Sequence, residues 1–158
     1  MVRSSGTAGK SAGLRKEAVP NSFVVVDDSP TILYLICSLL EHHKIGRVIG
    51  TASGGAEAIE RVRRLKPDFV LMDADMPEMS GLRTALVLSQ FRPETRIMLM
   101  SMDSNEHFRA GARACGADLV IYKPRFLSEL SSAFGHEMQH NMGLSNIPVS
   151  AGVQQRIE

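Results

Sequence analysis

The sequence predicts an α/β protein with a doubly wound, five-stranded parallel sheet and helices on both faces of the sheet. Three observations predict this fold. Short apolar runs alternate five times with segments of helical periodicity, which is the pattern of consecutive strand–helix units. The runs at 23–26 and 69–72 are apolar without alternation, as expected for parallel strands buried on both faces. Because crossovers between parallel strands are right-handed, the expected strand order is 2-1-3-4-5.

The first predicted unit is a strand at 23–27 that ends in Asp27 and is followed by Asp28. Ser29 then supplies a helix cap and Pro30 a first-turn proline. The apolar residues that follow recur at helical spacing and predict an amphipathic helix: Ile32, Leu35, Ile36, Leu39 and Leu40.

The second unit is a short strand at 47–51 and a helix bounded by glycine and proline. Gly54 and Gly55 open this helix, and Pro67 stops it. Its inward-facing residues are expected to be Ala58, Val62 and Leu65.

The third unit begins with the buried strand at 69–72, which ends abruptly in Asp73. Pro77 blocks further ladder pairing, and Gly81 leads into the next helix. The residues of that helix include Leu82, Ala85, Leu86 and Ser89.

The fourth unit has a strand at 96–100 that ends at Ser101. Asp103 and Glu106, three residues apart, resemble a capping box for the helix that follows. This helix contains Gly111 and several alanines and buries little apolar surface. We therefore expect it to be the most mobile element of the fold.

The last unit is a strand at 119–122, followed by Lys123 and Pro124 and by a helix at 126–140. The buried stripe of this helix is predicted to be Leu127, Leu130, Phe134 and Met138.

Composition predicts one domain between two flexible ends. Residues 1–21 form a disordered basic arm with a net charge of +3, residues 22–141 form the domain, and residues 142–158 form a flexible tail. The chain shows neither a run of about 18 apolar residues nor the apolar core of a secretory signal, and Cys37 and Cys115 share no metal-binding spacing. These features predict a cytoplasmic protein without a membrane span.

The polar residues that follow the strands predict a phosphate site with a metal ion. Parallel strands end at one edge of the sheet, so Asp27, Asp28, Asp73, Ser101 and Lys123 should converge there. The clustered carboxylates repel one another and favour a divalent cation such as Mg²⁺. With Asp73 as a nucleophile towards a phosphoryl group, the cation and the lysine would neutralise charge from two sides, and the serine hydroxyl would donate a hydrogen bond.

These residues resemble the motifs of the response-regulator receiver domains of bacterial two-component signalling, which have the flavodoxin-like fold. The resemblance covers residues 22–140 and rests on motifs that occur in the family's order: Asp27-Asp28, Asp73-x-x-Met76-Pro77, Gly81, Ser101 and Lys123-Pro124. It implies that Asp73 accepts phosphate from a sensor histidine kinase or a phosphotransfer protein. It further implies that Asp28, Asp73 and the backbone carbonyl of Asp75 hold Mg²⁺, with Asp27 acting through water, and that Ser101 and Lys123 sense the phosphate.

Two positions depart from the family pattern. Met102 stands where a small residue is frequent, and a side chain of this size is expected to shield the site. Val120 occupies the switch position, where an aromatic ring usually reports phosphorylation, and it has no ring to rotate. Phosphate acceptance is therefore a firmer expectation than the usual switch mechanism.

Three other functions stay open at this point. The chain can be a receiver-like module that regulates by protein contact without phosphorylation, or a Mg²⁺-dependent phosphohydrolase of the haloacid dehalogenase type, because Asp73-Ala74-Asp75 resembles that family's nucleophile pair. It can also be a receiver taken from a larger hybrid kinase or regulator. For a stand-alone receiver, the resemblance implies a downstream target protein bound by the face of the fourth helix, fifth strand and fifth helix. The same face often mediates homodimers, and no direct DNA binding is expected.

Overall fold

The computed structural model of the chain describes residues 21–141. The predicted tail and the arm up to residue 20 lie outside the described residues, and so does the packing of Met138. Asn21, which the sequence assigns to the arm, accepts a hydrogen bond through its carbonyl from the Arg47 N–H at 2.8 Å. No helix in the described part combines the length and the hydropathy of a membrane span.

A five-stranded sheet in the order β2-β1-β3-β4-β5 forms the centre of the molecule, and all its neighbouring strands are parallel. The strands are β1 (Ser22–Val26), β2 (Arg47–Ala52), β3 (Phe69–Asp73), β4 (Arg96–Ser101) and β5 (Leu119–Tyr122). The predicted fold class and strand order are confirmed.

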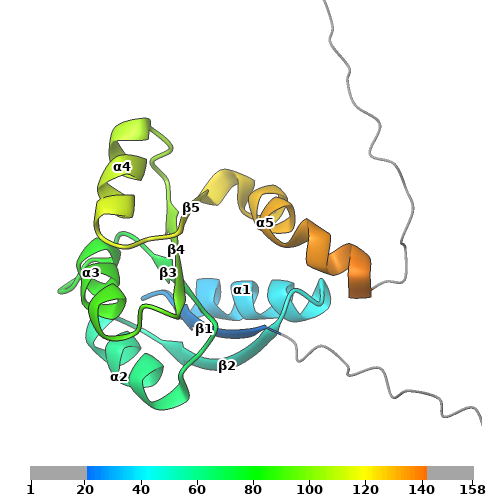
Figure 1. Ribbon diagram of the computed structural model, residues 1–158, viewed down its shortest axis with the longest axis horizontal. Helices are drawn as coiled ribbons and strands as arrows, with labels where there is room; N and C mark the ends of the chain where they lie inside the picture. The colour runs from blue at the N-terminus through cyan, green and yellow to red at the C-terminus, as the bar shows by residue number, and fades with distance from the viewer. Residues whose placement is uncertain (1–20, 142–158) are drawn as a thin grey trace, which may run out of the picture.

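Helices cover both faces of the sheet, with α1 and α5 on one side and α2, α3 and α4 on the other (Figure 1). Their bounds are α1 (Pro30–His42), α2 (Gly55–Leu65), α3 (Gly81–Phe91), α4 (Glu106–Ala114) and α5 (Phe126–Asn141), with a 3₁₀ turn, η1 (Lys123–Arg125), before α5. Pro30 lies in the first turn of α1, and Ser29 is its N-cap, as the sequence predicts.

The central strands bury side chains on both faces and so divide the core into two clusters. Val24 and Val70 belong to the cluster under α2, α3 and α4, whereas Val25 and Leu71 belong to the one under α1 and α5. All four are fully buried. Burial of such a side chain stabilises the fold by about 1.5–3 kcal/mol. The continuous apolar runs thus hold both helical layers on β1 and β3, and with them the strand ends that carry the polar residues.

The predicted capping box of α4 is wrong. Asn105 is the N-cap, and its side-chain oxygen accepts a hydrogen bond from Phe108 N–H at 2.8 Å. Asp103 instead accepts the N–H of Asn105 at 2.9 Å in the preceding turn. Both residue types stabilise helix starts, and the extra turn places the helix start two residues later than the sequence suggested. Ala112 is the one fully buried residue of α4, in keeping with the expected weak packing, while the mobility of α4 stays a prediction.

The apolar stripes of α1 and α5 are less buried than predicted. Leu35 is 50% exposed and Leu127 41% exposed, although both follow the helical spacing of buried neighbours. The two side chains line one groove of about 450 Å³ between α1 and the start of α5. Periodicity identifies the apolar face of each helix, but this groove leaves part of both faces uncovered.

We expect Gly81→Ala to destabilise the fold and Gly111→Ala to stabilise it. A Cβ on Gly81 would lie 2.3 Å from the Asp73 carbonyl oxygen, so the backbone at the end of β3 must move, at a cost of about 1–3 kcal/mol. A Cβ on Gly111 meets no atom within 4 Å and should add about 0.5–1 kcal/mol by reducing the freedom of the unfolded chain. Urea denaturation of both variants measures these free energies, and equal stabilities would contradict the expectation.

Candidate functional site

The sheet brings the predicted polar residues to one end. β1 and β3 are neighbours in register, with Val26 opposite Met72, so Asp27 and Asp73 follow at the same level. On the next strands, Asp73 is opposite Met100, and Ser101 is opposite Tyr122. Lys123 follows Tyr122 directly. Residues separated by up to about a hundred positions therefore lie at the carboxyl edge of one sheet, where open α/β folds bind ligands.

Asp73 and Lys123 form an ion pair in this site. Lys123 Nζ lies 2.8 Å from Asp73 Oδ1, and the same oxygen accepts the N–H of Asp75 at 3.3 Å. The Asp73 side chain is 6% exposed, whereas Lys123 is 30% exposed. The carboxylate is thus buried at the end of its strand, while its cationic partner reaches it from the protein surface.

Two further carboxylates, those of Asp27 and Asp28, lie close to that of Asp73. Asp27, Asp28 and Asp73 each offer an oxygen, and these oxygens lie within 4.8 Å of one another. Asp27 and Asp73 are buried and Asp28 is exposed. Three acids at this spacing supply hard oxygen ligands of the kind that Mg²⁺ prefers.

Asp27 has one buried oxygen without a protein partner. Its Oδ1 accepts the N–H of Ser29 at 2.9 Å, whereas its Oδ2 is buried and has no hydrogen bond. Burial raises the pKa of Asp27 above its ordinary value, and the neighbouring charges of Asp73 and Asp28 raise it further, against the opposing effect of the Ser29 N–H and Lys123. A cation bound among the three acids would satisfy the orphaned oxygen, so the donor set fits Mg²⁺.

The other predicted residues border the site. Ser101 is 1% exposed, and its Oγ accepts the N–H of Asp103 at 3.0 Å, which leaves its own hydroxyl proton to donate elsewhere. Asp75 is exposed in the loop after β3. The Met102 side chain is 62% exposed, and its shielding of the site stays a prediction.

The loop after β3 is held by backbone bonds to its neighbours. Ala74 N–H donates to the Met100 carbonyl at 2.8 Å, and Gly81 N–H donates to the Ala74 carbonyl at 2.9 Å. Glu78 has a positive φ of 64° between Pro77 and α3, which turns the chain sharply. The loop therefore returns to the strand end and fixes the backbone beside Asp73.

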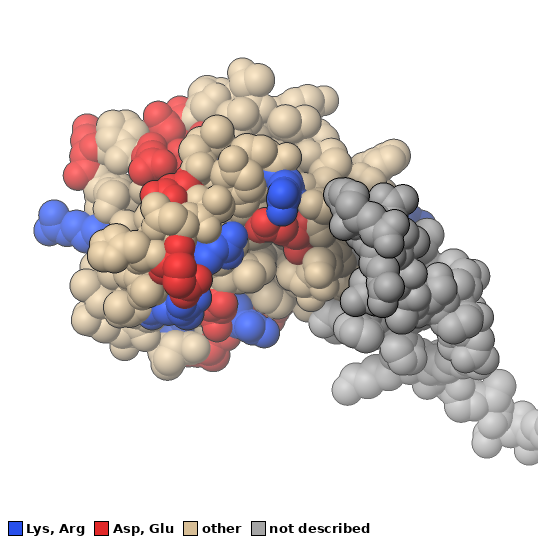
Figure 2. Space-filling model, turned by 90° about the horizontal axis from the view of Figure 1, so that it is seen from above, with Lys and Arg blue, Asp and Glu red and all other residues tan. Residues whose placement is uncertain are grey.

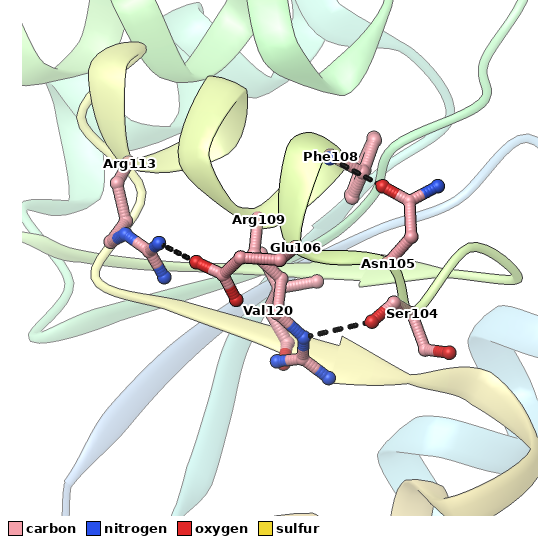
Figure 3. Close-up of polar contacts among 7 residues, drawn as sticks. All are labelled: Ser104, Asn105, Glu106, Phe108, Arg109, Arg113 and Val120. Carbon is pink, nitrogen blue, oxygen red and sulfur yellow. Dashed lines mark hydrogen bonds and ion pairs between the residues drawn. The ribbon is translucent and has the colours of Figure 1, made fainter.

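Val120 is 4% exposed and packs into the core cluster under α2, α3 and α4. Its carbonyl accepts a hydrogen bond from Arg109 of α4 at 3.0 Å, and Arg109 also donates to the Ser104 carbonyl at 3.3 Å (Figure 3). On the same helix, Arg113 bonds Glu106. These contacts of Arg109 are not predictable from sequence motifs, because its partners are backbone carbonyls rather than side chains.

In the absence of Mg²⁺, Asp27→Asn is expected to raise the free energy of unfolding at neutral pH by about 1–3 kcal/mol, since it removes a buried, incompletely bonded charge. The pKa of Asp27 is raised in the folded protein, so its favourable contribution is complete below pH 3.8 and is lost as the pH rises through the raised pKa. The advantage of the variant should therefore grow with pH.

Urea denaturation in EDTA, from pH 3.8 to neutral pH, tests this expectation. Asp28→Asn is the control, because Asp28 is exposed. With Mg²⁺ added, both variants should gain less stability than the wild type, because each lacks one ligand. If Asp27→Asn were less stable than the wild type in EDTA at neutral pH, the expected cost of the buried Asp27 charge would be contradicted.

Comparison with known families gives a match over most of the described chain. The family model of the response regulator receiver domain matches residues 23–134. The chain is 39% identical over 103 residues to protein-glutamate methylesterase/protein-glutamine glutaminase 2 of Methanospirillum hungatei, an alignment of 64% of this chain and 29% of that protein. The chain therefore spans less than a third of the length of this relative.

Solved structures of receiver domains are also similar to this chain. The receiver domain of the response regulator NarL from Mycobacterium tuberculosis superimposes with a TM-score of 0.69 at 26% identity, over 77% of this chain and 98% of that one. The BeF₃-activated DrrB receiver domain superimposes with a TM-score of 0.63 at 26% identity, over 77% and 98% of the two chains.

Proposed function

Because the chain belongs to the response regulator receiver domain family, we propose that Asp73 is its phosphoacceptor. The family is that of phosphoaccepting modules in two-component signalling. The observation that carries the assignment to this residue is the contact of 2.8 Å between Lys123 and the buried carboxylate of Asp73, which belongs to the acidic cluster. The proposed functional unit is residues 22–141, between the arm and the tail.

The proposed reaction is a phosphoryl transfer to a carboxylate oxygen of Asp73. The oxygen attacks phosphorus, a P–O bond to Asp73 forms, and the bond from phosphorus to the donor's histidine nitrogen or leaving oxygen breaks with its electron pair. Lys123 gives up part of its contact with Asp73 and pairs with the phosphoryl oxygens. The Ser101 hydroxyl group donates a hydrogen bond to one of these oxygens.

Asp27, Asp28 and Asp73, together with the carbonyl of Asp75, are proposed to hold Mg²⁺. When bound, this ion supplies positive charge that offsets the repulsion between the acids and the incoming phosphoryl group. The DrrB receiver domain, a similar structure, is known in a BeF₃-activated form, which supports an equivalent chemistry here. In this proposal the chain assists its own phosphorylation and is not a turnover enzyme towards other substrates.

The proposed donor is a histidine kinase or phosphotransfer protein that docks on the groove between α1 and α5. The groove reaches Lys123, is lined largely by apolar residues, and exposes Leu35 and Leu127. Acidic and basic side chains are interspersed on the face seen in Figure 2, without the single-sign field that nucleic-acid binding favours. A protein partner therefore fits the observed surface better than DNA, and the downstream target is also proposed to be a protein.

Leu35→Asp is expected to slow phosphorylation by a kinase about tenfold or more, while phosphorylation by a small donor stays unchanged, because a charge in an apolar docking groove opposes burial. The measurement uses a panel of autophosphorylated histidine kinases and acetyl phosphate. Leu86→Asp is the matched control, since Leu86 is 42% exposed on α3, on the other side of the sheet. Equal losses for the two variants would contradict the docking site.

The direct test of the proposed function is the intact mass of the protein after incubation with acetyl phosphate. With Mg²⁺, we expect a gain of one phosphoryl group that hydroxylamine removes, as for an acyl phosphate. In EDTA, we expect no gain. A protein that stays unmodified with Mg²⁺, both with acetyl phosphate and with phosphorylated kinases, would support regulation by protein contact alone and would sink this proposal.

A further inference from the structure

The open edge of the sheet is bonded by two charged side chains. β5 is an edge strand, so its outward backbone groups lack a neighbouring strand. Arg109 of α4 donates to the Val120 carbonyl at 3.0 Å, and Glu129 Oε2 of α5 accepts the N–H of Tyr122 at 2.8 Å. Arg109 and Glu129 also line one groove of about 280 Å³ along this edge. The two side chains thus replace a missing strand at two successive outward positions of β5.

The residue that Glu129 bonds, Tyr122, directly precedes Lys123 in the chain. Tyr122 is the last residue of β5 and Lys123 the first of η1, whose start has no side-chain cap. Glu129 lies in the first turn of α5, so its bond to Tyr122 ties the two ends of the corner that contains η1. The residue directly before Lys123 is therefore hydrogen-bonded to a carboxylate from the helix that follows.

We propose that Glu129 is a positioning residue that holds this corner so that the Lys123 ammonium stays on Asp73. The inference rests on the proposed function of Asp73. A lysine has a long flexible side chain, and Lys123 is 30% exposed, so a loose corner would let the ammonium spend time in solvent. Charge stabilisation of a transferring phosphoryl group depends on a fixed position of the cation. Glu129 therefore acts on the reaction through Lys123 without touching the acceptor.

The test compares Glu129→Ala with Glu129→Gln in the full chain. With Mg²⁺ and acetyl phosphate, Glu129→Ala should be phosphorylated about tenfold more slowly than the wild type, equivalent to about 1.4 kcal/mol of transition-state stabilisation. Glutamine keeps an oxygen that accepts the Tyr122 N–H, so Glu129→Gln should stay within about twofold of the wild type. This rescue separates the hydrogen bond from the charge at the helix start, which both variants lose.

Two control variants change residues near Glu129, one in the same groove and one at the same sheet edge. Ser132→Ala changes a residue that lines the same groove, and Arg109→Ala removes the edge bond to Val120 but leaves Tyr122 bonded. Both should keep a phosphorylation rate within about twofold of the wild type. A wild-type rate for Glu129→Ala, or an equal loss in Glu129→Gln, would overturn the inference.

A second readout does not depend on phosphorylation. This readout is the acylation of Lys123 by a small amine-reactive reagent, measured by peptide mass spectrometry. Acylation should be slow in the wild type, where Asp73 pairs with the ammonium, and severalfold faster in Glu129→Ala. Unchanged labelling of Lys123 would defeat the positioning role even if Asp73 is phosphorylated. If the wild type takes up no phosphate but the labelling changes as expected, the proposed function fails and the positioning role stands.

Discussion

Asp73→Asn is expected to abolish the uptake of phosphate from acetyl phosphate and from phosphorylated kinases. Asparagine has nearly the same size as aspartate, but its amide is a poor nucleophile, so the acceptor is lost without a change in packing. Intact-mass measurement after incubation with Mg²⁺ and donor checks this result. This is the largest effect that we expect, because Asp73 is the proposed acceptor, whereas the other residues of the site are proposed to act on the rate.

The matched control for this variant is Asp75→Asn. Asp75 lies two residues away, is exposed, and contributes its N–H to Asp73 rather than its side chain. It should therefore keep full phosphate stoichiometry. If Asp73→Asn took up phosphate at the wild-type stoichiometry, the acceptor would be a different residue.

Lys123→Ala is expected to lower the phosphorylation rate by about 10²–10³-fold, the typical loss when one charge-stabilising group is removed from a transition state. The variant should also be less stable by about 1–3 kcal/mol, because the buried Asp73 carboxylate loses its cationic partner beside Asp27. Intact-mass measurements on samples quenched at successive times give the phosphorylation rate, and urea denaturation gives the free energy of unfolding.

Arg125→Ala is the control for the loss of positive charge near the site. Arg125 is exposed, lies in the same 3₁₀ turn, and carries the same charge. It should change the rate of phosphorylation by acetyl phosphate by less than about threefold, as expected for a surface charge screened by salt. Equal losses in Lys123→Ala and Arg125→Ala would mean that general electrostatic attraction, and not the contact with Asp73, supports the reaction.

The sequence was informative where the chemistry depends on strand ends. The apolar runs before Asp27 and Asp73 predict two buried neighbouring strands, and the parallel order then brings Lys123 to the same edge. Side-chain type and the predicted strand order were enough for this part, because a parallel sheet offers few ways to arrange its carboxyl ends.

The sequence was less informative where the decisive partner is a backbone group or an open surface. Asp103 and Asn105 have similar capping propensities, so the start of α4 depends on a turn that the pattern does not contain. Leu35 follows the apolar period of α1 but lies on a groove. Glu129 reads as an ordinary acidic residue in a first helical turn, because its partner is the N–H of an edge strand.

We propose that the carboxylate of Asp73, and no other acid of the cluster, receives the phosphoryl group. Borohydride reduction of the phosphorylated protein converts an aspartyl phosphate to homoserine, and peptide sequencing by mass spectrometry then locates it. We expect homoserine at position 73 alone, in an amount equal to the phosphate bound with Mg²⁺. Homoserine at position 27, 28 or 75, or phosphate recovered on a serine, would contradict it.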